Sequence, residues 1–336
     1  MKRTLYVFQS GRLRRRHNTV CLEREGEDGV ERRVLPIEQL REIHLFGEVT
    51  LNSRLLRFLA RREVLIHVHD RHGWYTGTFY PREHYNSGHM VLRQAEHCLD
   101  PTRRLDLARR FVGGALANLA AVLRYYAGRG HGVSLAPILE GLERHQARLP
   151  EAGSVEELMQ IEGQAREIFY PAFDAILGRA EFAFQQRTRR PPRNRLNALI
   201  SFVNSLLYAA VLAEIYKTHL DPRIGYLHAT NFRRFTLNLD VAEVFRPVLA
   251  DRLVLRLVRL GRIRPSDFEE ALGGMYLTAE GRRRVVEAWE QRLATTLYHR
   301  GLRRHVSYRT LIRLELYRLQ KHLLGEKPYE PFRSRW

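Results

Sequence analysis

The sequence predicts an α+β fold, with a small N-terminal, mainly β domain followed by a larger all-α C-terminal domain. In the first ninety or so positions, short segments rich in β-branched and aromatic residues alternate with Gly and Asp turns. Beyond residue 101, apolar residues recur at spacings of three and four, as in helices. We expect a β-rich domain over 1–85, a linker over 86–100, a helical domain over 101–325 and an irregular tail over 326–336.

The β-rich domain should contain short strands and one helix. Strands are expected over 4–8, 19–23, 43–46, 64–68 and 74–79. Asn52 or Ser53 is a suitable N-cap for a helix that carries Leu55, Leu56 and Phe58 on its apolar side.

The rest of the chain reads as a series of helices. The apolar period begins at Leu105, and later helices are expected near 133–146, 154–186, 195–218, 239–262, 278–297 and 305–324. Gly- and Pro-containing breaks separate them, at 128–132, 191–192, 221–222, 261–265 and 273–274.

The chain is strongly basic, with 56 Lys and Arg against 37 Asp and Glu and a net charge of +19. Residues 1–100 hold 17 basic and 13 acidic side chains, so +15 of the surplus lies in residues 101–336. Such a surplus predicts a polyanionic partner. Nearly all the cations are arginines, whose planar fork suits phosphate, although the codon preference of a GC-rich genome would also favour Arg.

Cysteine content and hydropathy predict a cytoplasmic protein with no membrane partner. Cys21 and Cys98 are too few and too far apart for a disulfide framework or a zinc ribbon. The first ten residues contain no apolar run of secretory length. The most apolar run, 206–213, ends at Glu214 and is too short to span a membrane.

One carboxylate lies beside the apolar stripe of the helix expected from residue 154. Glu162 follows Leu158 by four residues and precedes Ala165 by three, so it shares their inward face. A carboxylate there needs a partner, which is either an Arg of the next helix or a metal ion. Gly163 beside it disfavours a helix by about 1 kcal/mol, which suggests that another group approaches the backbone.

His228 follows the break at 221–222 and precedes an acidic segment. Asp240 and Glu243 are three residues apart and share a helix face, although the same spacing also fits an ordinary capping box. Together with Glu162 and His228 they would suit a hard divalent ion such as Mg²⁺ or Mn²⁺. Spacing alone does not bring Glu162 to His228, because 66 residues separate them.

A basic segment lies between two expected helices and is held out of helix by Pro191 and Pro192. It is a candidate for DNA-phosphate contacts or, alternatively, a solvated connection. Its arginines are Arg187, Arg189, Arg190, Arg193 and Arg195. Arg233 and Arg234 are weaker candidates for the same role.

Taken together, the motifs resemble, along nearly the whole chain, the CRISPR-associated endonuclease and integrase family of spacer acquisition, the first-numbered Cas proteins. Glu162-Gly163 is similar to the family's Glu-Gly segment, and Gly225-Tyr226-Leu227-His228 to its Gly-Phe-Leu-His motif, with Tyr for Phe. Residues 239–247 resemble its Asp-Leu-x-Glu-x-Phe-Arg-Pro segment. Segments 2–7 and 73–82 look most like the subtype I-B branch.

The resemblance implies a metal-dependent DNA endonuclease and integrase of CRISPR adaptation. Spacer DNA would enter the repeat array by transesterification, when a 3′ hydroxyl attacks a phosphodiester. Glu162, His228 and Glu243 would bind Mg²⁺ or Mn²⁺, with Asp240 as an acidic helper, and activity would fall as His228 protonates below about pH 6.5. The alternatives are a non-catalytic basic nucleic-acid-binding protein and an unrelated metal-dependent nuclease.

The resemblance also implies partners. Double-stranded DNA would bind as prespacer fragments and as the CRISPR repeat. The β-rich domain would pair with its twin in a homodimer. Two such dimers would flank a small ferredoxin-like adaptation protein of the same operon, forming a heterohexamer.

Overall fold

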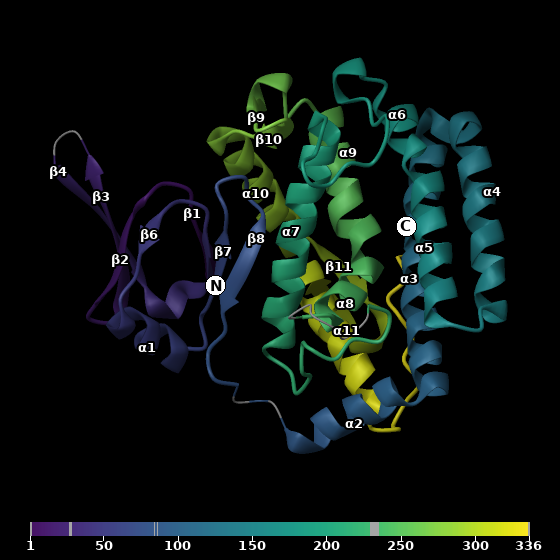
Figure 1. Ribbon diagram of the computed structural model, residues 1–336, viewed down its shortest axis with the longest axis horizontal. Coiled ribbons are helices and arrows are strands. Elements are labelled where there is room, and N and C mark those ends of the chain that lie inside the picture. Colours follow the sequence, from purple (N-terminus) through teal and green to yellow (C-terminus); the bar gives the residue numbers. More distant parts are fainter. Residues whose placement is uncertain (1, 27–28, 84, 86, 229–234, 335–336) are drawn as a thin grey trace. The chain divides into compact units, whose positions relative to one another are not determined.

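The structure, a computed structural model, describes residues 2–26, 29–83, 85, 87–228 and 235–334. The chain divides into two compact units, Met1–His84 and Tyr85–Trp336. The first unit is rich in strands and the second in helices, so the α+β prediction is confirmed (Figure 1).

The strand-rich unit is built from two four-stranded sheets and a helix. One sheet has the order β1-β5-β7-β8, with β1, β5 and β7 parallel, and the other has the order β4-β3-β2-β6. The elements are β1 (Arg3–Val7), β2 (Gly11–Arg16), β3 (Thr19–Gly26), β4 (Gly29–Pro36), β5 (Leu40–Leu45), β6 (Val49–Thr50), α1 (Ser53–Arg61), β7 (Leu65–His69) and β8 (Tyr75–Phe79).

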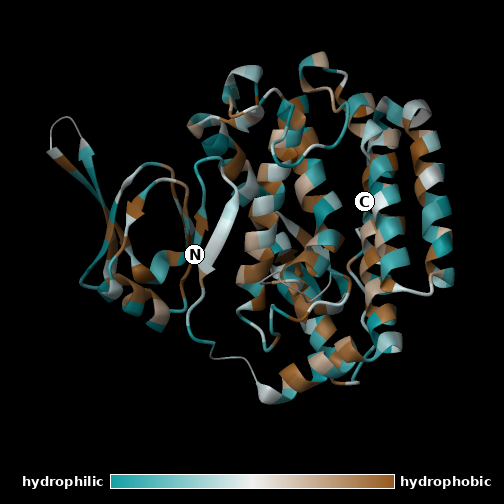
Figure 2. Cartoon of the chain, in the orientation of Figure 1, coloured by the Kyte–Doolittle hydropathy of each residue, from teal (hydrophilic) through white to brown (hydrophobic). Residues whose placement is uncertain are grey.

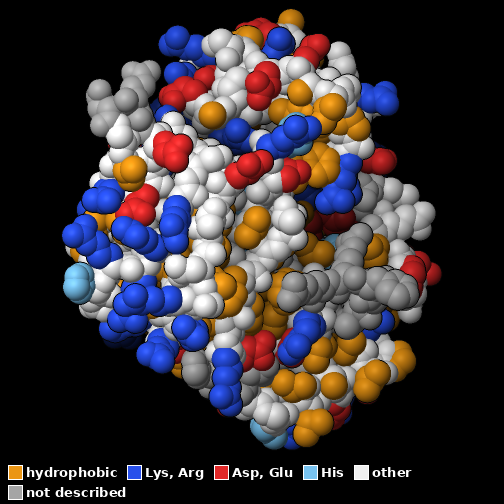
Figure 3. All heavy atoms as spheres, turned by 60° about the vertical axis from the view of Figure 1, so that its left-hand side comes forward, with side chains coloured by type: hydrophobic (Ala, Val, Ile, Leu, Met, Phe, Trp, Pro, Cys, Tyr) orange, Lys and Arg blue, Asp and Glu red, His pale blue; other side chains and the backbone are white. Residues whose placement is uncertain are grey.

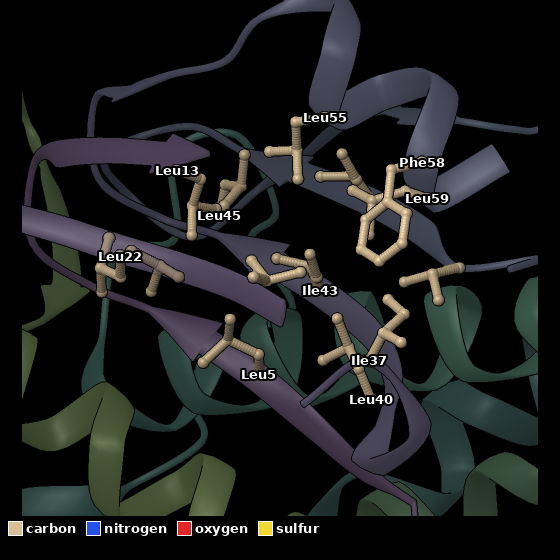
Figure 4. Close-up of a cluster of buried hydrophobic side chains, with 14 residues drawn as sticks. Leu5, Leu13, Leu22, Ile37, Leu40, Ile43, Leu45, Leu55, Phe58 and Leu59 are labelled. Carbon is tan, nitrogen blue, oxygen red and sulfur yellow. The ribbon is translucent and has the colours of Figure 1, made fainter. Parts of the chain in front are cut away.

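A hydrophobic core joins the two sheets and α1. Figure 4 shows Leu5, Leu13, Ile43, Leu55 and Phe58 pointing toward one another from β1, β2, β5 and α1. Burial of each such side chain stabilises the unit by about 1.5–3 kcal/mol. Of the two N-cap candidates for α1, Asn52 is the cap: its side chain accepts a hydrogen bond from the Leu55 N–H at 3.0 Å.

The strands β2 and β4 were not predicted from the sequence, because their side chains are mostly polar. In β2 only Leu13 is buried, and most of β4 is exposed. Cross-strand ion pairs replace apolar contacts on this sheet, such as Arg14 with Glu23 at 2.6 Å and Arg24 with Glu31 at 2.8 Å. A pattern search for β-branched and aromatic residues does not detect such strands.

The second unit is mainly helical. Figure 2 shows hydrophobic and hydrophilic residues together on helices such as α4 and α5, as amphipathic helices have. The helices are α2 (Gly88–Leu99), α3 (Pro101–Tyr126), α4 (Gly132–Arg148), α5 (Val155–Phe169), α6 (Pro171–Leu177), α7 (Arg195–Ile215), α8 (Leu237–Arg246), α9 (Arg252–Arg259), α10 (Ala279–Ala294) and α11 (Tyr308–Leu323).

This unit also contains two short β-hairpins, so the all-α expectation for it is wrong in this detail. They pair β9 (Phe268–Ala271) with β10 (Gly274–Leu277), and β11 (Thr296–His299) with β12 (Arg304–Ser307). Gly273 has a φ of 71° in the first turn, a conformation that glycine adopts without steric penalty. Of the Gly-Gly pair that was predicted as a break, Gly273 lies in the turn of this hairpin and Gly274 begins β10.

The helix boundaries also differ from the sequence prediction in two places. The segment 86–100, expected as a linker, contains α2, whose N-terminus is capped by Ser87. The helix expected over 154–186 ends at Phe169, and Pro171 begins the short helix α6. Proline is favoured in the first turn of a helix and not in its interior, so it marks the boundary between the two.

Helix α7, in the helical unit, is long and rich in apolar residues. By length and composition alone, among the described residues, Arg195–Ile215 could cross a membrane. The apolar run 206–213, which is too short to span a membrane, is only part of this longer helix. Of its most apolar 18-residue window, 83% is buried inside the structure, which assigns α7 to the protein core.

Over residues 324–334 the C-terminal tail has neither helix nor strand, yet it packs closely. Tyr329 and Phe332 are buried. The Phe332 ring stacks on Phe245 of α8 at 5.3 Å between centroids, and Asn118 of α3 donates a hydrogen bond to the Phe332 carbonyl at 2.9 Å. The tail therefore packs against α8 through the stacked rings of Phe332 and Phe245.

Candidate functional site

Two glutamates from different helices meet at one arginine. Glu162 lies on α5 and Glu243 on α8, and both helices pack against α3. The guanidinium of Arg166 donates to Glu162 Oε1 at 3.1 Å and to Glu243 Oε2 at 3.0 Å. The structure thus brings together two residues that lie 81 positions apart in the sequence.

Arg166 was not singled out by the sequence analysis. An Arg of the next helix was expected as the ion-pair partner of Glu162. The partner is instead Arg166, one turn further along the same helix. It is 4% exposed and also donates to Asp251 Oδ2 at 2.8 Å. The spacing of four between Glu162 and Arg166 is a signal that could have identified the pair.

Asp251 and Arg246 complete this buried charge network. Asp251 ends a π-helical turn, Pro247–Asp251, that joins α8 to α9. Such turns often occur at functional sites. Arg246 lies 3.4 Å from Glu243 and donates to the Tyr170 hydroxyl at 3.0 Å.

Asp240 holds the loop that carries His228. Its carboxylate accepts hydrogen bonds from the backbone N–H groups of Tyr226, Leu227 and His228, at 2.6, 3.1 and 2.9 Å. It also lies 2.8 Å from Nδ1 of the His228 ring. Asp240 is inside α8 and not at its N-cap, so the capping alternative is wrong for this residue.

The carboxyl groups of Glu162 and Glu243 have shifted pKa values in opposite directions. Burial raises the pKa of Glu162, and the charge of Glu243 raises it further against the opposing effect of Arg166. Burial acts in the same direction on Glu243, but Arg246 and Arg166 outweigh it and lower its pKa to about 2. Glu243 is therefore ionised throughout the physiological range, and the two carboxylates are close enough to influence each other.

The imidazole of His228 is also perturbed. Burial acts to lower its pKa, but hydrogen bonding and charge from Asp240, followed by the charges of Glu243 and Glu162, raise the pKa above the usual 6.5. His228 is thus electrostatically linked to both glutamates. His228, Glu162 and Glu243, which the resemblance implied as metal ligands, therefore lie near enough to one another for their charges to interact.

The chemistry of these side chains fits a divalent cation. Two carboxylates and one imidazole form a donor set that suits Mg²⁺ or Mn²⁺. Because Asp240 engages Nδ1 of His228, Nε2 is the nitrogen left to bind a metal, and a carboxylate behind a metal-binding histidine is a recurrent arrangement. The guanidinium of Arg166 shows that the place between Glu162 and Glu243 accommodates positive charge.

One expectation near this site is wrong. Gly163 was expected to allow close approach to the α5 backbone, but apart from α5 itself no atom of the described residues lies within 4 Å of the position that a Cβ there would take. The structure gives no packing reason for this glycine.

The arginines of the basic segment fall into two groups. Arg187 donates to Asn197 Oδ1 at 2.8 Å and to Ser201 Oγ at 3.0 Å, and Arg195 donates to the Glu181 carbonyl at 3.2 Å. These two arginines therefore hold the segment against its own unit. The remaining members, Arg189, Arg190 and Arg193, are exposed.

Tyr170 connects the basic segment to the acidic centre. Its hydroxyl accepts from Arg246 and also hydrogen-bonds to Arg187. Arg189 is near enough for its charge to act on the half-buried Tyr208, whose pKa is also affected by the charge of Glu243. Arg233 and Arg234 lie outside the described residues. In the face drawn in Figure 3, Lys and Arg side chains gather at the left of the view.

A second polar cluster lies in the strand-rich unit and was not predicted from the sequence. Glu42 and His44 on β5 and His67 on β7 are buried. Among the described residues, these three side chains form the group whose possible metal-ligand atoms all lie within 4.8 Å of one another. The alternation of Glu42 and His44 along one strand is a signal that could have suggested a shared face.

Comparison with known proteins shows the family to which the chain belongs. The family model described as "CRISPR associated protein Cas1" matches residues 5–291. The chain is 50% identical over 336 residues to "CRISPR-associated endonuclease Cas1 2" of Thermodesulfovibrio yellowstonii, covering 100% of both chains. It is 46% identical over 326 residues to "CRISPR-associated endonuclease Cas1" of Thermotoga maritima, covering 97% of this chain and 98% of the relative.

Solved structures give the same picture of the fold. A CAS1 protein from Thermotoga maritima matches with a TM-score of 0.87 and 45% identity, over 97% of this chain and 98% of that one. A casposase bound to integration product matches with a TM-score of 0.84 over 100% of this chain and 96% of that one. At 20% identity, the second likeness concerns the fold alone.

Proposed function

The chain belongs to the Cas1 family of CRISPR-associated proteins, and from this premise we propose that it is a metal-dependent DNA endonuclease and integrase of CRISPR adaptation. The observation that carries the proposal is the group formed by Glu162, Glu243 and the His228–Asp240 pair. Endonuclease is also the activity named for its relatives of 46–50% identity.

Three side chains of the centre would bind one Mg²⁺ or Mn²⁺ ion, and a fourth would orient one of them. Glu162 and Glu243 offer carboxylate oxygens, and His228 offers Nε2 while Asp240 fixes its ring. When bound, such an ion polarises the phosphoryl oxygens and stabilises the charge that develops on the attacking and leaving oxygens. Arg246 and Arg166 keep Glu243 ionised, and Arg166 also holds Glu162 by a hydrogen bond.

The reaction is a transesterification. The 3′ hydroxyl of a captured DNA fragment attacks a phosphodiester at the edge of a repeat. A new phosphorus–oxygen bond forms to that 3′ oxygen, the bond to the strand's own 3′ oxygen breaks, and that oxygen leaves as a hydroxyl. The number of phosphodiester bonds is unchanged, and water in place of the 3′ hydroxyl gives hydrolysis at the same centre.

Double-stranded DNA is the proposed substrate, both as prespacer fragments and as the repeat. The exposed Arg189, Arg190 and Arg193 lie on the segment that Arg187 and Tyr170 connect to the acidic centre. Their charges would offset the repulsion between DNA phosphates and the buried carboxylates.

The proposed partners follow from family membership. We propose a homodimer formed through the strand-rich unit and a heterohexamer in which two dimers flank the small ferredoxin-like adaptation protein. A cytoplasmic location and the subtype I-B assignment stay predictions of the sequence.

The function is tested by joining a short duplex with free 3′ hydroxyls to a supercoiled plasmid in Mn²⁺. Glu162→Gln and His228→Ala should each slow joining about 100-fold or more, because each removes a ligand. EDTA should abolish joining by the wild-type protein, and a donor with 3′-dideoxy ends should not be joined.

The matched control is Glu167→Gln, an exposed glutamate on the same helix, which should join at the wild-type rate. Joining by both ligand variants at the wild-type rate would refute the site. Tight DNA binding by the wild-type protein with no metal-dependent joining would instead favour a non-catalytic DNA-binding protein.

A further inference from the structure

The buried cluster in the strand-rich unit has the chemistry of a separate metal site. Glu42 and His44 are two residues apart on β5, so both side chains lie on the same face of the sheet. His44 is directly opposite His67 in the parallel pairing of β5 with β7. All three residues are at most 2% exposed.

The scaffold of this cluster is rigid. Both β5 and β7 are inner strands of the β1-β5-β7-β8 sheet, each hydrogen-bonded on two sides. The opposite face of β5 carries Ile43 and Leu45, which pack in the hydrophobic core shown in Figure 4. Ligand groups on such strands are held more precisely than groups on loops.

Each candidate ligand makes a hydrogen bond with a further residue, which orients it. His67 Nδ1 lies 2.8 Å from Thr78 Oγ1, and His44 Nδ1 lies 3.0 Å from His69 Nε2. Thr4 donates to Glu42 Oε1 at 3.1 Å. With Nδ1 of both rings engaged, Nε2 is the nitrogen that each would offer, and such outer hydrogen bonds are what fix the rings of metal-binding histidines.

We propose that Glu42, His44 and His67 bind a zinc ion, in a site separate from the catalytic centre. Two imidazoles and one carboxylate form a ligand set found in zinc sites, and a water molecule would complete a tetrahedron. In that geometry, bonds of about 2.0–2.2 Å place ligand atoms about 3.3 Å apart. The possible ligand atoms of the three side chains already lie within 4.8 Å of one another, so a bound zinc ion would draw them closer together.

The two sites differ in the ions that they favour. Two imidazoles favour zinc and its neighbours in the first transition series, whereas the oxygen-rich set of Glu162, Glu243 and His228 favours Mg²⁺ or Mn²⁺. The zinc would join two neighbouring strands across one face of the sheet. Because the zinc would lie in the strand-rich unit and bind none of the residues of the catalytic centre, its binding does not depend on the proposed catalytic function.

The test uses untagged full-length protein in which Glu162→Gln and Glu243→Gln disable the catalytic centre. After chelation and dialysis, it is titrated with ZnCl₂ in competition with a chromophoric chelator. We expect about one zinc ion per chain, a rise in melting temperature with zinc, and visible absorption bands on substitution with Co²⁺.

On the same background, Glu42→Gln retains side-chain size and should weaken zinc binding about 10- to 100-fold, while His44→Gln with His67→Gln should abolish it. His89→Gln, which removes an exposed histidine on α2, is the matched control and should bind zinc unchanged. Circular dichroism verifies that each variant is folded.

The proposal is overturned if the background protein binds no zinc at micromolar concentrations. It is equally overturned if folded Glu42→Gln retains full affinity and the same melting-temperature shift.

Discussion

Arg166 is the side chain that holds the acidic centre together in the absence of metal. Its guanidinium contacts Glu162, Glu243 and Asp251, within 2.8–3.1 Å of each. Buried carboxylates without a counter-charge are strongly unfavourable. The single arginine therefore stabilises the fold at the same place where a cation would bind.

Removal of Arg166 should make the fold depend on metal. We expect Arg166→Ala to lower the free energy of unfolding by about 3 kcal/mol in EDTA, because breaking a buried ion pair leaves an uncompensated charge. Mn²⁺ should restore part of this loss. Urea denaturation with and without the ion measures both effects.

Arg144→Ala on α4, an exposed position, is the control and should change stability by no more than about 0.5 kcal/mol. Equal stability of Arg166→Ala and the wild-type protein in EDTA would show that the carboxylates do not need this guanidinium.

The protonation of His228 sets the acid limit of metal binding. A proton and a metal ion compete for the imidazole, and the pKa of His228 is raised above 6.5 by Asp240 and the two glutamates. On acidification, Mn²⁺ affinity should therefore begin to fall at a pH above 6.5, earlier than the sequence predicted. Asp240→Asn should lower this pKa and move the fall to lower pH.

Titration of the His228 ring by NMR in metal-free protein, together with Mn²⁺ binding measured by electron paramagnetic resonance, checks this shift. Asp106→Asn, at a part-exposed ion pair on α3, should leave the titration unchanged. An imidazole that titrates at or below pH 6.5 in the wild-type protein would contradict the role of Asp240.

At the residue level, periodicity predicted that Glu162 faces inward, and it does so at 21% side-chain exposure. Periodicity could not pair Glu162 with His228 or Glu243, because that contact depends on how α5 and α8 pack against α3. The resemblance to known motifs supplied the grouping. Neither approach revealed that Asp240 would hold three backbone N–H groups, since the bonds depend on the loop conformation.

At the scale of elements, the basic segment before α7 is the part that should contact DNA. Arg189→Ala with Arg193→Ala removes two exposed cations. We expect weaker DNA binding and a salt dependence of log K that is shallower by about one to two units, because about 0.9 counterion is released per phosphate contact. Fluorescence anisotropy over a series of salt concentrations measures the slope.

Arg144→Ala with Arg148→Ala on α4 lowers the net charge by the same amount and serves as the control. If both double variants flatten the slope equally, the effect comes from net charge and not from contacts of this segment.

Element prediction succeeded where one physical signal dominated. The amphipathic period located α3, α4, α10 and α11, the long apolar run located α7, and the pair Asn52-Ser53 located the start of α1. It failed in β2 and β4, where ion pairs replace apolar alternation. It also merged α5 with α6, because the apolar pattern continues across the proline that begins α6.

At the scale of the whole molecule, composition predicted a polyanionic partner, and the structure adds where opposite charges lie. The part of the chain that carries a net charge of +15, residues 101–336, also contains the half-buried Glu162 and the buried Glu243, Asp240 and Asp251. The net charge of the chain does not reveal that acidic side chains gather at one place within its basic part. Only the packing of distant segments produces it.

The order of synthesis gives helix α7 a further importance. Its packing partners include α8, α9, β10 and α11, all of which follow it in the sequence. On the ribosome, α7 emerges before the segments that will cover it, so its apolar surface stays open until the C-terminal third of the chain has been translated. Chaperones that recognise exposed apolar segments should therefore bind the nascent chain at this helix and release it as the last helices dock.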